Sequence, residues 1–274
     1  MADTLARTVA APAARRAPRS GPGKLWIPMA LCFGFLYLPI AVLIAMSFND
    51  GGSAFSWDGF SFRWYDELAH DDRLKDAAVT SLVVAAGATV VATVLGTLLA
   101  VGLARHTRSR LLEASAMAPA ILPDLLLAIG LLSFFYVASI PKSATTVLLA
   151  HAAFGTAFVV AVVRARLAGM DASQEEASRD LGAGALDTFL RITLPSIAPA
   201  VIAGALLVFT LSLDEFVIAF FTAGPTTQTL PIAVYSMVRT GVTPEINALA
   251  TVLVAISVLV VVVAARALRV KERP

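Results

Sequence analysis

The sequence predicts an all-α membrane protein with six transmembrane helices, and three observations support that class. Of the 274 residues, 58% are apolar and 15% are charged, whereas a soluble domain carries about 25% charged residues. The apolar residues occur in blocks of about 20 or more, which is the length that crosses a bilayer core. Lys and Arg are distributed unevenly between alternate connections, as in proteins whose loops face opposite sides of a membrane.

Six apolar segments have the length of a membrane span. They cover residues 25–47, 79–103, 115–139, 144–167, 196–222 and 247–268. We expect residues 1–24, which are rich in Ala, Pro and Arg, to be a disordered basic arm, and residues 269–274 to be a short tail. The first apolar run exceeds the roughly 7 to 15 residues of a signal-peptide core, so we interpret it as an uncleaved first span. The predicted organisation is therefore one transmembrane domain over residues 25–268.

The positive charges predict the orientation of these spans. The N-terminal arm, the connections between spans two and three and between spans four and five, and the C-terminal tail together hold 16 Lys and Arg residues. The opposite connections hold 5. Because basic residues near span ends remain cytoplasmic, both termini are predicted to lie in the cytoplasm.

The first connection on the opposite side, residues 48–78, is acidic and also contains Trp57, Trp64 and Tyr65. One interpretation is a solvated loop with an aromatic belt at the membrane interface. The other is a docking or collecting surface for a cationic ligand or for the protein that carries it.

The connection between predicted spans four and five, residues 168–195, is the one predicted cytoplasmic loop that is long enough to fold. Asp171 or Ser173 suits a helix N-cap. Gly182 and Gly184 then interrupt the helical pattern before a second short amphipathic stretch. The segment predicts two short helices that lie along the membrane surface and are joined by a glycine elbow.

This connection carries a family motif. Glu176, Ala177 and Ser178 precede Gly182, and after nine further residues come Ile192, Thr193, Leu194 and Pro195. The spacing closely resembles the EAA loop of the inner-membrane permeases of binding-protein-dependent ABC importers, in which the third residue is usually Ala. In that family the loop forms coupling helices that fit a groove on a cytoplasmic ATPase. The resemblance implies that the ATPase-coupling residues are Glu176, Ala177, Ser178, Gly182, Ile192, Leu194 and Pro195.

The resemblance extends over most of the chain. The segments "SFND", "LPDLLLAIGLLSFF" and "LSLDEFVIAFFTAGPTTQTLPIAVYSMVRTG" are similar to the second permease of spermidine/putrescine importers. The resemblance implies a homologous second permease, two copies of an ATP-binding subunit, an extracytoplasmic solute-binding protein and a bacterial inner-membrane location. Import would then proceed by alternating access, with ATP hydrolysed in the separate subunit.

Three acidic residues lie within the predicted spans. Asp124 follows Pro119 and Pro123, which would open the third span locally. Asp214 and Glu215 lie in the outer part of the fifth span. Because charged groups at such depths usually face a cavity or a partner, we expect Asp124 and one of Asp214 or Glu215 to line the path of an organic cation. The alternative is that these carboxylates bond to a partner subunit or to freed backbone groups.

Several other functions lack a sequence motif. The only Gly-Lys pair, Gly23-Lys24, is not part of a phosphate-binding loop, so ATP binding by that motif is excluded. We expect no cofactor, no metal site and no nucleic-acid partner. A permease for another small solute, an ion-driven secondary transporter and a polytopic membrane enzyme are the alternatives, but the sequence shows neither a clear internal repeat nor a nucleophile-and-base pair.

Overall fold

The computed structural model confirms the all-α class and describes residues 26–53, 56–105, 107, 109–241 and 243–271. Within these ranges, extended pairing is confined to one isolated bridge between Asn49 and Phe60. The predicted basic arm and the last three residues of the predicted tail lie outside the described residues.

The longest helices are α1 (Trp26–Met46), α3 (Asp72–Arg105), α6 (Ala144–Ala168), α9 (Leu194–Asp214) and α12 (Pro244–Lys271). The intermediate ones are α4 (Arg110–Ile121), α5 (Asp124–Val137) and α11 (Leu230–Thr240). The short ones are α2 (Arg63–His70), α7 (Ser173–Asp180), α8 (Ala185–Thr188), the π-helical turn η1 (Phe189–Thr193) and α10 (Val217–Thr222).

In the part of the chain that the structure describes, four helical stretches are long and apolar enough to cross a membrane. They are α1, α3, α6 and the run Ala185–Asp214, which contains α9. The pair α4 and α5 gives a fifth if it is counted as one bent span, and α12 contributes the shorter apolar stretch Pro244–Leu259. The count of six spans and their orientation therefore stay predictions.

The predicted third span differs from the structure, because it is two helices bent by 110° at a break. Leu122 (ψ 140°) and Pro123 (ψ 135°) are both extended there. Proline excludes the residue before it from the helical region, which explains the break at Leu122, whereas Pro119 stays inside α4. As a result, Asp124 begins α5 instead of lying in the middle of a continuous span.

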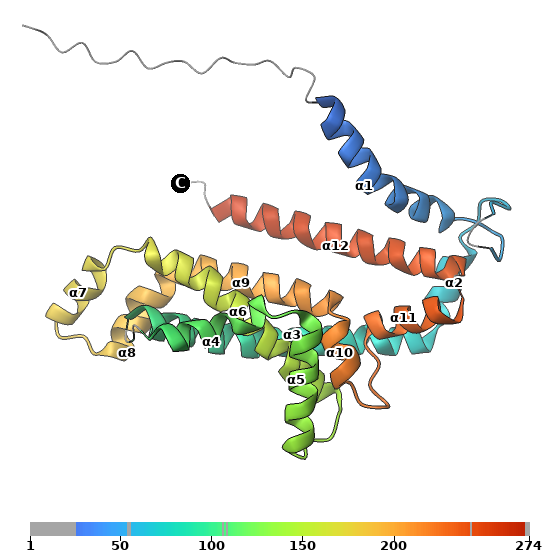
Figure 1. Cartoon of the computed structure of the whole chain (residues 1–274). Helices are drawn as coiled ribbons and strands as arrows, with labels where there is room; N and C mark the ends of the chain where they lie inside the picture. The colour runs from blue at the N-terminus through green and yellow to red at the C-terminus, as the bar shows by residue number, and fades with distance from the viewer. Residues whose placement is uncertain (1–25, 54–55, 106, 108, 242, 272–274) are drawn as a thin grey trace, which may run out of the picture.

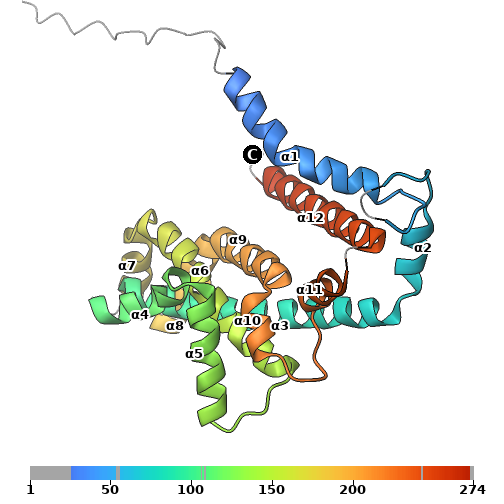
Figure 2. The same cartoon turned by 45° about the vertical axis from the view of Figure 1, so that its right-hand side comes forward.

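The predicted fifth span is also divided. α9 ends at Asp214, and Glu215 is extended (ψ 112°) before α10 begins at Val217. Both carboxylate oxygens of Glu215 accept from the backbone N–H of Ile218 at 3.1 Å, so this side chain caps the first turn of α10. Because α10 packs against α5, the two breaks lie close together (Figure 2).

The core of the bundle is formed by α3, α6 and α9. Small residues allow these helices to approach closely, as is common in membranes. A Cβ added to Gly155 of α6 would lie 2.6 Å from Cγ1 of Val208 on α9 and 3.3 Å from Cβ of Ala92 on α3. These three helices therefore form one tightly packed unit.

The remaining helices surround this unit (Figure 1). α7 and α8 lie at one end of the bundle, and α2 and α11 lie toward the other. α1 has no buried residue and runs beside α12, away from the core. The predicted coupling segment lies at the α7–α8 end, whereas the three predicted path carboxylates lie at the breaks between α4 and α5 and between α9 and α10.

Candidate functional site

The connection between α6 and α9 folds as two short helices with a glycine elbow, as predicted. Gly182 has φ +85°, the left-handed region that favours glycine. The N–H of Ala183 donates to Ser178 O at 3.1 Å, and the N–H of Gly182 donates to Arg179 O at 2.9 Å. These two bonds form a Schellman motif, which ends α7 and turns the chain toward α8.

The N-cap of α7 is Ala172 and not Asp171 or Ser173, the two candidates predicted from the sequence, and its side chain makes no capping hydrogen bond. The N–H of Ser173 donates to Asp171 Oδ1 at 2.9 Å, and this bond lowers the pKa of the Asp171 carboxyl. Glu175 and Glu176 lie in the first turn of α7, where the helix dipole favours negative charge.

A groove of about 660 Å³ separates α7 from α8 and η1. We call it the α7–α8 groove. Four residues of the motif line it: Ala177, Ser178, Gly182 and Ile192. Ser178 Oγ lies 3.2 Å from Thr188 Oγ1, so the hydroxyl that replaces the usual Ala of the family joins α7 to α8. Glu176 is exposed on α7 and is not among the residues that line the groove.

Glu175, which was not predicted as a site residue, joins this segment to the neighbouring helices. The residue is buried, with 5% of its surface exposed. Glu175 Oε2 lies 3.0 Å from Nε of Arg105, the last residue of α3, and Oε1 accepts from Thr193 Oγ1 at 2.8 Å. We call this group the Glu175 clasp. It joins α7 to the end of α3 and to the start of α9.

The entry into α9 is continuous. η1 ends at the buried Thr193, and Leu194 and Pro195 occupy the first turn of α9. Pro195 is tolerated there because the first amide groups of a helix have no carbonyl partner within the helix. Movement of α7 would therefore reach α9 both through the backbone of η1 and through the clasp.

The three membrane carboxylates have different surroundings. Asp214 is the last residue of α9; its side chain is exposed and has no hydrogen-bond or ion-pair partner among the described residues. Glu215 caps α10, as described above. Asp124 begins α5 and lies near enough to Glu215 for their charges to interact. The structure brings Asp124 and Glu215 together at the two helix breaks and places Asp214 in a separate pocket.

This pocket has a volume of about 410 Å³ and lies between α3, α9, α11 and α12. We call it the α9–α11 pocket. Its walls include Leu82, Leu213, Asp214, Phe216, Tyr235 and Ile256. The rings of Phe216 and Tyr235 lie 4.8 Å apart, centroid to centroid. These two aromatic residues were not predicted from the sequence, because α11 and the break between α9 and α10 come together only in the fold.

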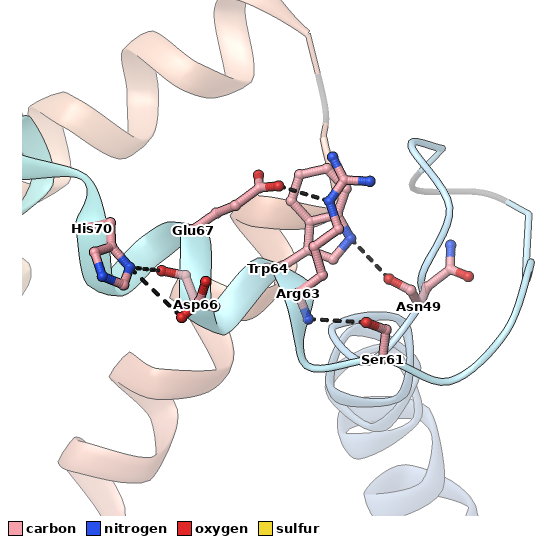
Figure 3. Close-up of polar contacts among 7 residues, drawn as sticks. All are labelled: Asn49, Ser61, Arg63, Trp64, Asp66, Glu67 and His70. Carbon is pink, nitrogen blue, oxygen red and sulfur yellow. Dashed lines mark hydrogen bonds and ion pairs between the residues drawn. The ribbon is translucent and has the colours of Figure 1, made fainter.

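Hydrogen bonds and ion pairs join residues of α2 to one another and to the loop that precedes it (Figure 3). Trp64 Nε1 donates to Asn49 O at 2.8 Å, and Arg63 Nε lies 2.7 Å from Glu67 Oε1. The Arg63 guanidinium also lies 4.9 Å from the centre of the Trp64 ring. Internal contacts thus account for these residues, and the two interpretations of the acidic loop stay open.

The N-terminus of α12 lies beside this loop. Burial raises the pKa of Glu245, and the negative charges of Asp71 and Glu67 raise it further. The positive charge of Arg73 opposes this shift and lowers the pKa of Glu245 in part.

His151 of α6 is almost fully buried, and its Nδ1 lies 2.7 Å from Ser212 Oγ of α9. Its Nε2 is also buried and has no hydrogen-bond partner among the described residues. Among the described residues, no group of three or more His, Cys, Asp or Glu side chains is arranged to hold a metal ion.

Comparisons with known proteins fit this arrangement. Residues 92–273 match the family model described as "Binding-protein-dependent transport system inner membrane component". The chain is 45% identical over 234 residues to the putrescine transport system permease protein PotI of Escherichia coli strain K12, covering 82% of this chain and 83% of that protein. It is 39% identical over 236 residues to the spermidine/putrescine transport system permease protein PotC of Haemophilus influenzae, covering 85% and 92%.

Solved structures show the same fold. A bacterial alginate ABC transporter, crystallised with an alginate-pentasaccharide-bound periplasmic protein, contains a chain that matches with a TM-score of 0.70 at 17% identity, covering 90% of this chain and 94% of that one. The MetNI methionine ABC transporter in an inward-facing conformation contains a chain that matches with a TM-score of 0.59 at 17% identity, covering 73% and 94%.

Proposed function

The chain belongs to the family of binding-protein-dependent transport system inner membrane components, and from that premise we propose that it forms half of the translocation path for a polyamine, putrescine or spermidine. It is an ABC importer permease and not an enzyme. The observation that carries the choice of solute is the identity of 45% to a putrescine permease over most of both chains.

The proposed assembly contains a homologous second permease, two copies of an ATP-binding subunit and an extracytoplasmic binding protein. Closure of the ATPase pair would move the two coupling segments together and open the path toward the binding protein. Hydrolysis would then restore the inward-facing state.

We propose that the α7–α8 segment is the ATPase contact. The exposed Glu176 and the groove lined by Ala177, Ser178 and Gly182 support this assignment. Leu181 is 89% exposed and Leu186 is 69% exposed, and such apolar side chains suit burial against another protein. Three further residues of the motif, Ile192, Leu194 and Pro195, would then transmit movement from this contact into α9.

We also propose that Asp124, Asp214 and Glu215 line the cation path. An ammonium group that leaves water loses hydration free energy, and carboxylates along the route offset that loss. The three carboxylates lie at helix breaks or helix ends and not within continuous helix. Within a membrane, such irregular backbone is tolerated only where it is buried in protein or lines a water-filled cavity.

Uptake by the reconstituted importer tests the choice of solute. The permease pair, the ATPase and the binding protein encoded with them would be placed in vesicles, and ATP-dependent uptake of labelled putrescine and spermidine would be measured. We expect uptake of at least one polyamine, competition by the other and none by neutral amino acids. ATP-dependent uptake of another solute, with none of either polyamine, would establish the alternative small-solute function.

A further inference from the structure

The α9–α11 pocket has the composition of a site for a primary alkylammonium group. Its volume of about 410 Å³ falls within the range of about 300–1,000 Å³ that is typical of small-molecule sites. Asp214 is the one ionisable carboxylate in its lining, and most of the remaining wall is aliphatic or aromatic.

Two features give this carboxylate a free negative charge. Asp214 has no partner among the described residues, as shown above. It also ends α9, where the helix dipole adds negative potential and does not compensate the charge. An unpaired carboxylate at membrane depth marks a functional site, and its natural partner is a cation.

The aromatic rings beside Asp214 favour an organic cation. Phe216 follows Asp214 by two residues, and its ring packs against the ring of Tyr235 of α11 in the pocket wall. The ring of Phe220 lies 5.8 Å from that of Tyr235 and extends this cluster. Aromatic faces attract ammonium groups but offer little to a strongly hydrated metal ion, which takes oxygen ligands.

The remaining walls suit methylene groups. Leu82 of α3, Val234 of α11 and Ile256 of α12 line the pocket with aliphatic side chains. The hydroxyl of Ser81 is already occupied, because it accepts from the N–H of Leu230 at 2.8 Å. The pocket therefore offers one anionic end and a largely apolar body.

We propose that the α9–α11 pocket binds one end of an alkylamine, with Asp214 paired to the ammonium group and with Phe216 and Tyr235 against it. This proposal rests on the proposed polyamine function and names the residues that recognise the solute. With a single carboxylate, the pocket neutralises one of the two charges of a diamine. It therefore binds a monoamine of the same chain length as well, and excludes an α-amino acid, whose carboxylate would oppose Asp214.

Binding to the complete importer in nanodiscs, without the binding protein, tests the site. The probes are labelled putrescine and labelled n-butylamine, each measured directly, with unlabelled n-butylamine and alanine as competitors of putrescine. For the wild-type importer we expect competition by butylamine and none by alanine. Asp214→Asn should weaken putrescine binding by about tenfold or more, because it removes a charge-assisted contact while keeping the shape of the side chain.

Three further variants separate the effect of the Tyr235 ring from that of its hydroxyl, and the effect of the Asp214 charge from that of the pocket volume. Tyr235→Leu should weaken binding by about threefold to tenfold, whereas Tyr235→Phe, which keeps the ring, should stay near the wild type. Ala78→Leu fills the pocket from α3 without altering a charge and should also abolish binding. This variant keeps the test decisive if Asp214→Asn fails to copurify with the ATPase.

Unchanged putrescine binding in an assembled Asp214→Asn or Ala78→Leu importer would overturn the proposal. If wild-type importer binds butylamine but not putrescine, and Asp214→Asn loses butylamine, the pocket assignment stands and the polyamine function fails. If wild-type importer binds neither amine, the pocket assignment fails, and the uptake assay decides the function separately.

Discussion

Two carboxylates that lie near opposite ends of α9 have opposite surroundings. Beside the start of the helix, the buried Glu175 of α7 is paired with Arg105 and accepts from Thr193. At the end of the helix, Asp214 is exposed to a pocket and has no partner among the described residues. From this difference we infer that the charge of Glu175 stabilises the fold, whereas the charge of Asp214 is available to a ligand.

Helices α3 and α9 both extend from the surroundings of Glu175 to the pocket that contains Asp214. Arg105 ends α3, and Leu82, near the other end of α3, lines the α9–α11 pocket. Thr193 precedes α9, and Asp214 ends it. Because α3 and α9 also pack through small residues, we infer that a displacement of α7 moves both walls of the pocket together.

The largest expected effect is the loss of the Glu175 clasp. Glu175→Ala leaves Arg105 partly buried without its partner, and breaking a buried ion pair in this way costs about 3–5 kcal/mol. We expect a clear fall in the thermal unfolding midpoint of the purified importer. Replacing both residues, as in Arg105→Leu with Glu175→Leu, should cost less than Glu175→Ala alone. If the double variant is the less stable one, the clasp is not the structural pair described here.

The adjacent glutamate gives the matched control. Glu176 is exposed and makes no ion pair among the described residues, so Glu176→Ala should leave the unfolding midpoint of the permease pair unchanged. It should instead reduce ATPase copurification and ATP-driven uptake by about tenfold, the effect of losing one well-placed charged contact at an interface. Wild-type copurification and uptake in this variant would remove Glu176 from the docking surface.

A smaller effect is expected at the elbow. Gly182→Ala forces a Cβ into the left-handed region at φ +85°, at a cost of about 1–2 kcal/mol. We expect weaker ATPase copurification with a nearly normal unfolding midpoint. Gly184→Ala is the control, because Gly184 has φ −71° and an added Cβ meets no atom closer than 4.0 Å. Equal copurification of the two variants would argue against a strained elbow.

The smallest effect concerns Glu245, beside Asp71 and Glu67. Its raised pKa means that folding favours the protonated form of the Glu245 carboxyl. The stability that this protonated form contributes is fully present below the unfolded-state pKa and is lost as the pH rises through the folded-state pKa. Glu245→Gln should therefore raise the unfolding midpoint slightly at pH 7.5, with the difference from wild type shrinking toward pH 4. A difference that grows on acidification would contradict this assignment.

Part of this account could be predicted from the sequence. The glycine elbow was predicted because Gly182 and Gly184 interrupt an otherwise helical pattern, and the all-α class followed from the apolar blocks. Pro123 pointed to local opening of the third span. The bend of 110° could not be predicted, because proline removes a helical bond without setting the direction in which the next helix leaves.

The different roles of neighbouring residues could be assigned only from the three-dimensional structure. Glu175 and Glu176 are alike in sequence, and only the packing of α7 against η1 and the contact with Arg105 at the end of α3 bury the first and leave the second exposed. Likewise, Asp214 and Glu215 are adjacent, yet the end of α9 leaves one in a pocket and turns the other into a helix cap. Phe216 and Tyr235 are separated along the chain and meet only in the structure.

The most direct test of the contrast between the two carboxylates is putrescine uptake per ATP hydrolysed by the Asp214→Asn importer in vesicles. We expect ATP hydrolysis and the unfolding midpoint to match the wild type while uptake falls by about tenfold or more, because the solute has lost its charged contact. Wild-type uptake per ATP would contradict the account, since the free carboxylate would then have no part in transport.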